Sequence, residues 1–207
     1  MANGAQGFNC VEATWVQPTV RCRGTTNQSA VYWVGLGGYG QRALVQIGTE
    51  STCIGGEALA AAWHESLPRE RFSIRAPLDI SVGDRIWAQV RWLSGSRYRL
   101  SLVDLTTRKD FSIRVNNTTL KRTSAEWIVE APTGGCPSHC RTLKMPDFKT
   151  FRFRAAWVAI GGVRRQIDSA RFTHVLETMV SSAGATRAEV TSTAADGSSF
   201  AVRWRRP

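Results

Sequence analysis

The sequence lacks several features that would assign it to a particular class of protein. No apolar run approaches the roughly 20 residues that a membrane-spanning helix needs, and neither an internal repeat nor an interdomain linker divides the 207 residues. The first residues, MANGAQGFNC, contain neither the basic nor the apolar segment of an export signal. We therefore expect no membrane partner and a single domain spanning residues 1–207.

Acidic residues are scarce, because 16 Asp and Glu stand against 27 Lys and Arg for a net charge of +11. This balance favours an anionic partner. The basic residues are nevertheless scattered over many short segments, and the chain lacks zinc-finger spacing, an RNP motif and a basic helix. We therefore expect no specific nucleic-acid partner. Because few carboxylates are available for ion pairs, their protonation would remove little stability, which suits an acidic medium.

Cysteine is also infrequent, with five residues at positions 10, 22, 53, 136 and 140. The short spacing in GGCPSHC, which includes His139, raises the question of a metal site, but no second ligand pair with zinc-binding spacing follows. We prefer a local disulfide between Cys136 and Cys140, and Cys22 and Cys53 are candidates for a second. Disulfides indicate an oxidising compartment, so we expect a secreted protein whose signal peptide is absent from this chain.

Short strand-like segments separated by Gly, Asn, Asp or Ser dominate the chain, and many of them alternate apolar and polar side chains. Only GGEALAAAWHES at 55–66 has a helix-like composition, and its position between strands argues against a helix. The pattern predicts an all-β protein, a sandwich of two stacked antiparallel sheets. The expected strands lie at 29–38, 42–51, 71–80, 84–93, 96–105, 110–117, 125–131, 148–162, 173–180, 187–194 and 198–205.

The segment AEWIVEAP at 125–132 carries two carboxylates in a run otherwise suited to a buried strand. Because side chains alternate along a strand, Glu126, Ile128 and Glu130 share one face. A half-buried strand with an outward polar row has the same pattern. Other segments, however, also combine Trp, Gln or Glu with a small neighbour on one face: Trp33 with Gly35, Gln46 with Gly48, and Trp63 with Glu65.

Such faces, with glycines that permit close approach, would form a groove for an extended ligand, although unrelated solvent-facing residues would give the same pattern.

A nucleophilic triad is disfavoured, because His64, His139 and His174 lack a G-x-S-x-G or Cys-His context. A glycosidase needs two carboxylates flanking one bond. Glu126 and Glu130 are about 13 Å apart along a strand, which is too far, but Glu130 with Glu50 or Glu65 keeps this class open.

The order of several stretches along nearly the whole chain is specific: FNCVEATWVQPTVRC, VYWVGLGGYGQRALVQIGTES, AAWHESLP, ISVGDRIWAQV, AEWIVEAP, LKMPDFKTFRF and DGSSFAVRW. In this order they resemble the glutamic peptidases, the eqolisin family of acid endopeptidases, and the chain looks like a prokaryotic-type member. The resemblance implies two curved antiparallel sheets, similar to a lectin-like jelly roll, with a substrate cleft on the concave face. It also supports the pairs Cys22–Cys53 and Cys136–Cys140, which leaves Cys10 unpaired.

The motifs ALVQIG and AEWIVE place the family's catalytic glutamine and glutamate on Gln46 and Glu130. Glu130 would act as general base and acid, and the Gln46 amide would stabilise the oxyanion. We expect the pair to project from adjacent strands into one concave face. The resemblance also implies that Trp33, Glu50 and Glu65 contact substrate and orient the pair, and that Glu126 has a supporting role.

The chain departs from the family pattern at three places. Gly37 stands where the family usually has Asp, so a carboxylate near the site is missing. His64, Ser66 and Leu67 replace aromatic residues of a family stretch that commonly reads YAWYEWYP. ANGAQG matches the family's first strand poorly, which predicts an incomplete N-terminal strand. These differences imply an altered substrate preference and a shifted pH optimum.

The sequence therefore predicts a secreted, acid-acting endopeptidase that hydrolyses polypeptide substrates with a Gln/Glu dyad. We expect it to need no metal and no cofactor and to be a monomer. The alternative is a non-catalytic jelly-roll module that binds carbohydrate or peptide.

Overall fold

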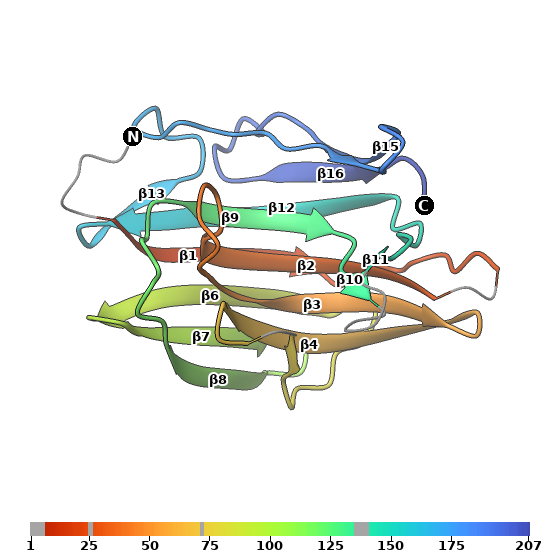
Figure 1. Ribbon diagram of the computed structural model, residues 1–207, viewed down its shortest axis with the longest axis horizontal. Coiled ribbons are helices and arrows are strands. Elements are labelled where there is room, and N and C mark those ends of the chain that lie inside the picture. Colours follow the sequence, from red (N-terminus) through yellow and green to blue (C-terminus); the bar gives the residue numbers. More distant parts are fainter. Residues whose placement is uncertain (1–6, 25–26, 71–72, 135–140) are drawn as a thin grey trace.

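The computed structural model describes residues 7–24, 27–70, 73–134 and 141–207, whose strands form two stacked antiparallel sheets and a small hairpin (Figure 1). The larger sheet has the order β14 (Met179–Val180), β15 (Thr186–Val190), β16 (Phe200–Trp204), β12 (Thr150–Ile160), β1 (Phe8–Val16), β6 (Arg85–Ser94), β7 (Arg97–Asp104) and β8 (Lys109–Asn116), with β13 (Val163–Gln166) paired to β12. The smaller sheet has the order β5 (Ile74–Arg75), β4 (Glu57–Leu67), β3 (Leu44–Ile54), β2 (Gln28–Gly37) and β9 (Ala125–Glu130). The hairpin pairs β10 (Thr133–Gly134) with β11 (Arg141–Thr142).

The predicted all-β sandwich is confirmed, and most predicted strands are present with shifted ends. Residues 57–67 form the strand β4, paired with β3 along its whole length, so the alanine-rich composition at 55–66 does not produce a helix. In the described part of the predicted strand at 71–80, which is 73–80, the strand is limited to the two residues of β5, and the predicted strand at 173–180 is limited to β14. Strand β1 was not predicted, although it lies near the middle of the larger sheet. Within the described ranges there is no helix long and apolar enough to cross a membrane.

The hydrophobic core lies between the two sheets and is rich in aromatic rings. Tyr32 of β2 stacks on Phe151 of β12, with 4.5 Å between the ring centroids, and Trp15 of β1 meets Phe153 edge-on at 5.8 Å. The Nε1–H of Trp15 also donates a 3.0 Å hydrogen bond across the sandwich to Oγ1 of Thr49. Because these contacts use the inner faces, the outer face of each sheet is free for other roles.

The Cys22–Cys53 disulfide is present and joins the segment before β2 to the end of β3, as predicted. Cys10 is a free, buried cysteine, which also agrees with the prediction. The predicted Cys136–Cys140 disulfide and the expected incomplete N-terminal strand concern residues 136–140 and 1–6, which lie outside the described residues.

Candidate active site

A second, smaller apolar cluster lies on the outer face of the five-stranded sheet. Along β2 the even-numbered residues face the main core, whereas Val31 and Trp33 belong to this outer cluster, as strand alternation requires. The cluster also contains Leu44 and Trp63, with Leu67 and Ile128 packed against it. It forms the apolar floor of a groove.

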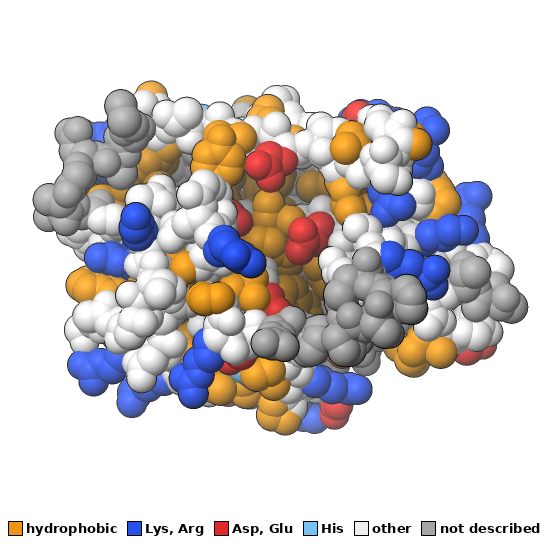
Figure 2. Space-filling model, viewed as in Figure 1, with side chains coloured by type: hydrophobic (Ala, Val, Ile, Leu, Met, Phe, Trp, Pro, Cys, Tyr) orange, Lys and Arg blue, Asp and Glu red, His pale blue; other side chains and the backbone are white. Residues whose placement is uncertain are grey.

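The groove has a volume of about 760 Å³ and combines this apolar floor with acidic side chains. Figure 2 shows the hollow, with acidic side chains beside its hydrophobic floor. Among the described residues that line it, none is Lys or Arg, although the whole chain has a net charge of +11. The polar lining includes Gln46 and the carboxylates of Glu50, Glu65, Glu126, Glu130 and Glu177.

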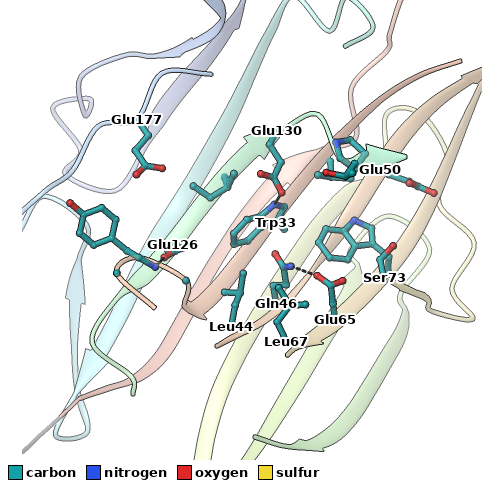
Figure 3. Close-up of a pocket in the computed structure, with 18 residues that line it drawn as sticks. Trp33, Leu44, Gln46, Glu50, Glu65, Leu67, Ser73, Glu126, Glu130 and Glu177 are labelled. Atoms are coloured by element: carbon teal, nitrogen blue, oxygen red, sulfur yellow. Dashed lines mark hydrogen bonds between the residues drawn. The ribbon is translucent and has the colours of Figure 1, made fainter. Parts of the chain in front are cut away.

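Gln46 and Glu130 both line this groove, as the sequence predicts, but they do not come from adjacent strands. Gln46 is on β3 and Glu130 is on β9, and β2 runs between them. Gly35 of β2 is paired with Gln46, whereas Val31 is paired with Glu130. Figure 3 shows Trp33 between the two side chains, which both point into the groove. Period-two alternation identified the shared face correctly, but it contains no information on strand order.

The amide of Gln46 is buried and held in one orientation. Its side chain is 5% exposed, and Nε2 donates a 2.6 Å hydrogen bond to Oε2 of Glu65, which is the paired residue on β4. Its Oε1 is buried and has no hydrogen-bond partner. A buried acceptor without a partner has a free-energy penalty of about 1–3 kcal/mol. The amide therefore has an acceptor, and a second hydrogen on Nε2, that no described residue uses.

The carboxyl group of Glu130 accepts a 3.2 Å hydrogen bond from Nε1–H of Trp33. The pKa of Glu130 is raised to about 7, chiefly by burial and in smaller part by the carboxylates of Glu65 and Glu177, while the Trp33 hydrogen bond lowers it. A carboxyl group with a pKa near neutrality exchanges protons readily in both directions. The geometry thus places a proton carrier at one side of the Trp33 indole and a neutral amide at the other.

Two glycines make space for the Trp33 side chain. A Cβ atom on Gly48, the residue paired with Trp33 on β3, would lie 2.6 Å from the Trp33 Cβ and 2.1 Å from the carbonyl oxygen of Tyr32. A Cβ atom on Gly35 would lie 2.9 Å from Cζ3 of the indole. The small residues that the sequence places beside Gln46 and Trp33 therefore accommodate the indole that contacts Glu130.

Glu126 holds the turn at one end of the groove. Its Oε1 accepts hydrogen bonds from the backbone N–H of Tyr39 at 2.6 Å and from the Ser124 hydroxyl at 3.2 Å. Burial raises the pKa of Glu126 to about 7 despite these hydrogen bonds. Gly38 has a φ of 92°, and a Cβ atom there would lie 2.7 Å from the Glu126 carboxylate oxygens. Glu126 thus has the supporting contacts that the sequence predicts.

The remaining predicted site residues also line the groove. Burial raises the pKa of both Glu50 and Glu65, while Arg75 lowers that of Glu50 and the Gln46 hydrogen bond lowers that of Glu65. Sequence reasoning did not identify Glu177, which lies in the loop before β14 and also faces the groove (Figure 3). The sequence places Glu177 in the predicted strand at 173–180, but in the structure β14 begins only at Met179, so strand alternation does not determine where this side chain points.

The departures from the family pattern have distinct structural consequences. Gly37 has a φ of 88°, and a Cβ atom there would lie 2.5 Å from the backbone carbonyl oxygen of Ala43, so this backbone does not accommodate the family's Asp. His64 is buried on the inner face and stacks on Phe111 at 5.6 Å, away from the groove. Ser66 is likewise buried, whereas Leu67 lines the groove. Among the three replaced aromatic positions, only Leu67 therefore changes the groove lining.

No group of three or more His, Cys, Asp or Glu side chains suited to a metal ion occurs in the part of the chain that the structure describes. The groove instead offers an apolar floor for an extended chain, a neutral amide and several carboxyl groups with raised pKa values. Carboxyl groups of this kind transfer protons to and from water in acid–base hydrolysis. The groove therefore contains the kinds of group that acid–base hydrolysis requires.

The model of the peptidase A4 family matches residues 1–204, so the chain belongs to this family of glutamic peptidases and is a glutamic endopeptidase. A comparison with curated proteins finds no match. Among solved structures, a scytalido-glutamic peptidase with a transition-state analogue inhibitor has a TM-score of 0.79 and 24% identity, over 96% of this chain and 93% of the other. The aspergilloglutamic peptidase from Aspergillus niger has a TM-score of 0.74 and 25% identity, over 86% of this chain and 99% of the other. SCP-B, an eqolisin in complex with the tripeptide Ala-Ile-His, has a TM-score of 0.76 and 23% identity, over 96% of this chain and 93% of the other.

Proposed function

We propose that the protein hydrolyses internal peptide bonds with Glu130 as general base and acid and Gln46 as the oxyanion donor. The single observation that carries the assignment is the pair itself. A buried carboxyl group with a pKa of about 7 and a buried amide with a free carbonyl oxygen face one groove. Peptide hydrolysis needs a proton acceptor for water, a donor for the oxyanion and a proton donor for the leaving nitrogen.

In the first step, the water molecule donates one hydrogen bond to Oε1 of Gln46 and transfers its other proton to the ionised Glu130 as its oxygen attacks the carbonyl carbon. The carbonyl oxygen becomes the oxyanion and accepts a hydrogen bond from the second hydrogen of the Gln46 Nε2. The C–N bond then breaks, and Glu130 returns the proton to the leaving nitrogen. Glu130 ends ionised, so each turnover consumes one water molecule and restores the site.

The raised pKa of Glu130 determines the pH range of this reaction. The base must be ionised, and with a pKa of about 7 only about a tenth of the molecules carry ionised Glu130 one pH unit lower. The same pKa makes protonated Glu130 a good acid for the second step. We therefore assign the acid-acting reaction to mildly acidic solution, with activity falling as the pH drops well below 7.

We assign extended polypeptides as the substrates and expect the protein to be a secreted monomer. The groove runs across the strands with an apolar floor, which suits a peptide in extended conformation. The solved structures of two similar proteins support this class, because one contains a peptide-based transition state analogue and the other the tripeptide Ala-Ile-His. Secretion is supported by the Cys22–Cys53 disulfide, because disulfides persist in oxidising compartments.

The test is cleavage of denatured casein between about pH 3 and 8, the range in which a carboxyl of raised pKa titrates, by the wild type and by two variants. Glu130→Gln keeps the size of the side chain but removes the proton carrier, so hydrolysis should fall to background. Gln46→Ala should lose at least the roughly 10²-fold that one oxyanion donor contributes. Glu57→Gln is the matched control, because Glu57 is exposed at the start of β4. Full activity in Glu130→Gln would refute the dyad, and binding of peptide or glycan without cleavage by the wild type would favour the binding module.

A further inference from the structure

The outer face of the nine-stranded sheet, on the side of the sandwich away from the groove, collects arginines that are dispersed in the sequence. On β6, Ile86, Ala88 and Val90 are fully buried in the core, so the odd-numbered residues face outward. Inward and outward side chains alternate in the same way on β1 and β7, which flank β6, and on the next strands out, β12 and β8. The outward arginines include Arg85, Arg91, Arg97, Arg99, Arg114 and Arg154.

Three of these arginines form a row across adjacent strands, which we call the arginine row. Arg91 of β6 is paired with Arg99 of β7, and Arg99 is paired with Arg114 of β8. Directly paired side chains in antiparallel strands have Cβ atoms about 4.5–5.5 Å apart, and like charges at such positions destabilise the sheet. The arrangement therefore concentrates positive charge at a cost to the stability of the fold.

No carboxylate neutralises the arginine row among the ion pairs of the described residues. The nearby Glu12 is 8% exposed and already accepts hydrogen bonds from Arg164 and from Nε2 of Gln89. Within the described residues, Nε of Arg91 donates a hydrogen bond to Oε1 of Gln89, and the Arg91 side chain also hydrogen-bonds the Cys10 thiol, its paired residue on β1. The guanidinium groups consequently retain most of their donors for an external anion.

Uncharged hydrogen-bonding groups occupy the adjacent row of the same face. Ser101 is paired with Ser112, and their hydroxyl oxygens are 3.2 Å apart. Ser101 is also paired with Gln89 on the other side. The face thus has one row of guanidinium groups beside one row of hydroxyl and amide groups. This arrangement suits a ligand that carries both anionic groups and hydroxyls.

We propose that the arginine row binds a linear acidic polysaccharide and attaches this peptidase to it. A chain lying across the strands would meet a guanidinium group at every strand, about 4.8 Å apart, which is close to the length of one sugar unit. Its carboxylate or sulfate groups would pair with Arg91, Arg99 and Arg114, and its hydroxyls with Ser101 and Ser112. These residues take no part in the proposed dyad, so this site does not depend on the proposed reaction.

Nucleic acid and membrane surfaces fit the arginine row less well. Single-stranded nucleic acid binds through open aromatic faces on which bases stack. The guanidinium of Arg164 covers the outward Trp157 ring at 4.2 Å from its centroid, and the outward Trp87 lies four residues along β6 from Arg91, away from the arginine row. Anionic membranes bind amphipathic elements that insert apolar side chains, whereas the rows directly beside Arg99 on β6, β7 and β8 consist of Arg, Ser, Asn and Gln side chains. Electrostatic and hydrogen-bonding complementarity therefore favours the polysaccharide.

The experiment measures binding of the full chain to heparin and to polygalacturonate as a function of salt concentration. The variant Arg91→Gln/Arg99→Gln/Arg114→Gln should bind both polymers at least about tenfold more weakly, with a salt slope smaller by about three, one for each lost contact. The matched control Arg21→Gln/Arg171→Gln/Arg206→Gln removes the same charge from exposed positions outside the sheet strands. It should lose less than threefold.

Thermal unfolding and competing ligands complete the test. Because the like-charge pairs are removed, the row variant should melt at a temperature no lower than the wild type. Heparin should raise the melting temperatures of the wild type and the control variant more than that of the row variant. Arg99→Gln by itself should lose affinity in part, which provides a second test if the triple variant does not fold. Equal losses in the row and control variants, or absence of wild-type binding, would overturn the proposal. Tighter binding to a single-stranded oligonucleotide or to phosphatidylglycerol vesicles than to either polysaccharide would also overturn it.

Discussion

Gln46 and Glu65 are directly paired across β3 and β4, and the Gln46 Nε2–H donates a 2.6 Å hydrogen bond to Oε2 of Glu65. This contact fixes which end of the amide faces which way. A carboxylate accepts hydrogen bonds and cannot donate them, so it binds the NH₂ end of the amide and leaves Oε1 of Gln46 without a partner among the described residues. Glu65 is therefore a positioning residue for the proposed oxyanion donor.

We expect Glu65→Ala to lower kcat by about 10- to 100-fold with a smaller change in KM, because misplacing one catalytic group has an effect of this order. Glu65→Gln keeps an acceptor for Gln46 and should recover part of the activity. Steady-state kinetics on one peptide substrate, with melting temperatures as a folding control, would measure this. Equal activity of Glu65→Ala and the wild type would show that Gln46 needs no such partner.

Trp33→Phe should move the acid limb of the pH–activity profile to higher pH. The Trp33 hydrogen bond lowers the pKa of Glu130. Without this bond the pKa should rise above its value of about 7, by on the order of half to one unit. The ionised base would then be scarcer in mildly acidic solution. The pH dependence of kcat/KM would measure the shift, and an unchanged limb would contradict a role for this bond.

Glu177→Gln should move the same limb in the opposite direction. The negative charge of Glu177 raises the pKa of Glu130, so its removal lowers that pKa and extends activity to lower pH. The expected displacement is on the order of half a unit, because the groove is partly open to solvent. Glu57→Gln, at the exposed start of β4, is the control for the loss of one charge. A limb that moves upward would show that Glu177 acts through something other than its charge.

The buried carboxyl groups should also make the fold less stable as the pH rises. Burial raises the pKa of Glu126 and of Glu130 to about 7. Between the unfolded value near 4.5 and the folded value, the native state binds more protons than the unfolded state. Its stability is therefore fully present below about pH 4.5 and decreases as the pH rises through 7.

Glu130→Gln should remove part of this dependence. Above pH 7 the neutral amide avoids burial of a charge, so unfolding in urea should require on the order of 1–3 kcal/mol more free energy than in the wild type. Near pH 4.5, where the wild-type carboxyl is protonated in the native state, the two proteins should differ little. A variant less stable than the wild type at pH 8 would contradict the burial of a charged Glu130.

Much of the site was predictable from alternation along individual strands. Glu126 and Glu130, Gln46 beside Gly48, and Trp33 beside Gly35 each share a face because successive side chains of a strand point to opposite sides. The order of the motifs then assigned the family, and the pairing of Cys22 with Cys53 agreed with it. These features depend on local geometry and on short stretches of sequence, so they could be inferred without knowledge of strand order.

Strand order, register and loop placement were decided only by the tertiary structure. The insertion of β2 between Gln46 and Glu130, and the presence of Glu177 in the groove, follow from how distant segments pair and pack. Arg91, Arg99 and Arg114 likewise form a row only because β6, β7 and β8 pair in one register. Alternation determines which face of its own strand each side chain occupies. Which side chains of other strands lie beside it depends on the free energy of packing the whole chain.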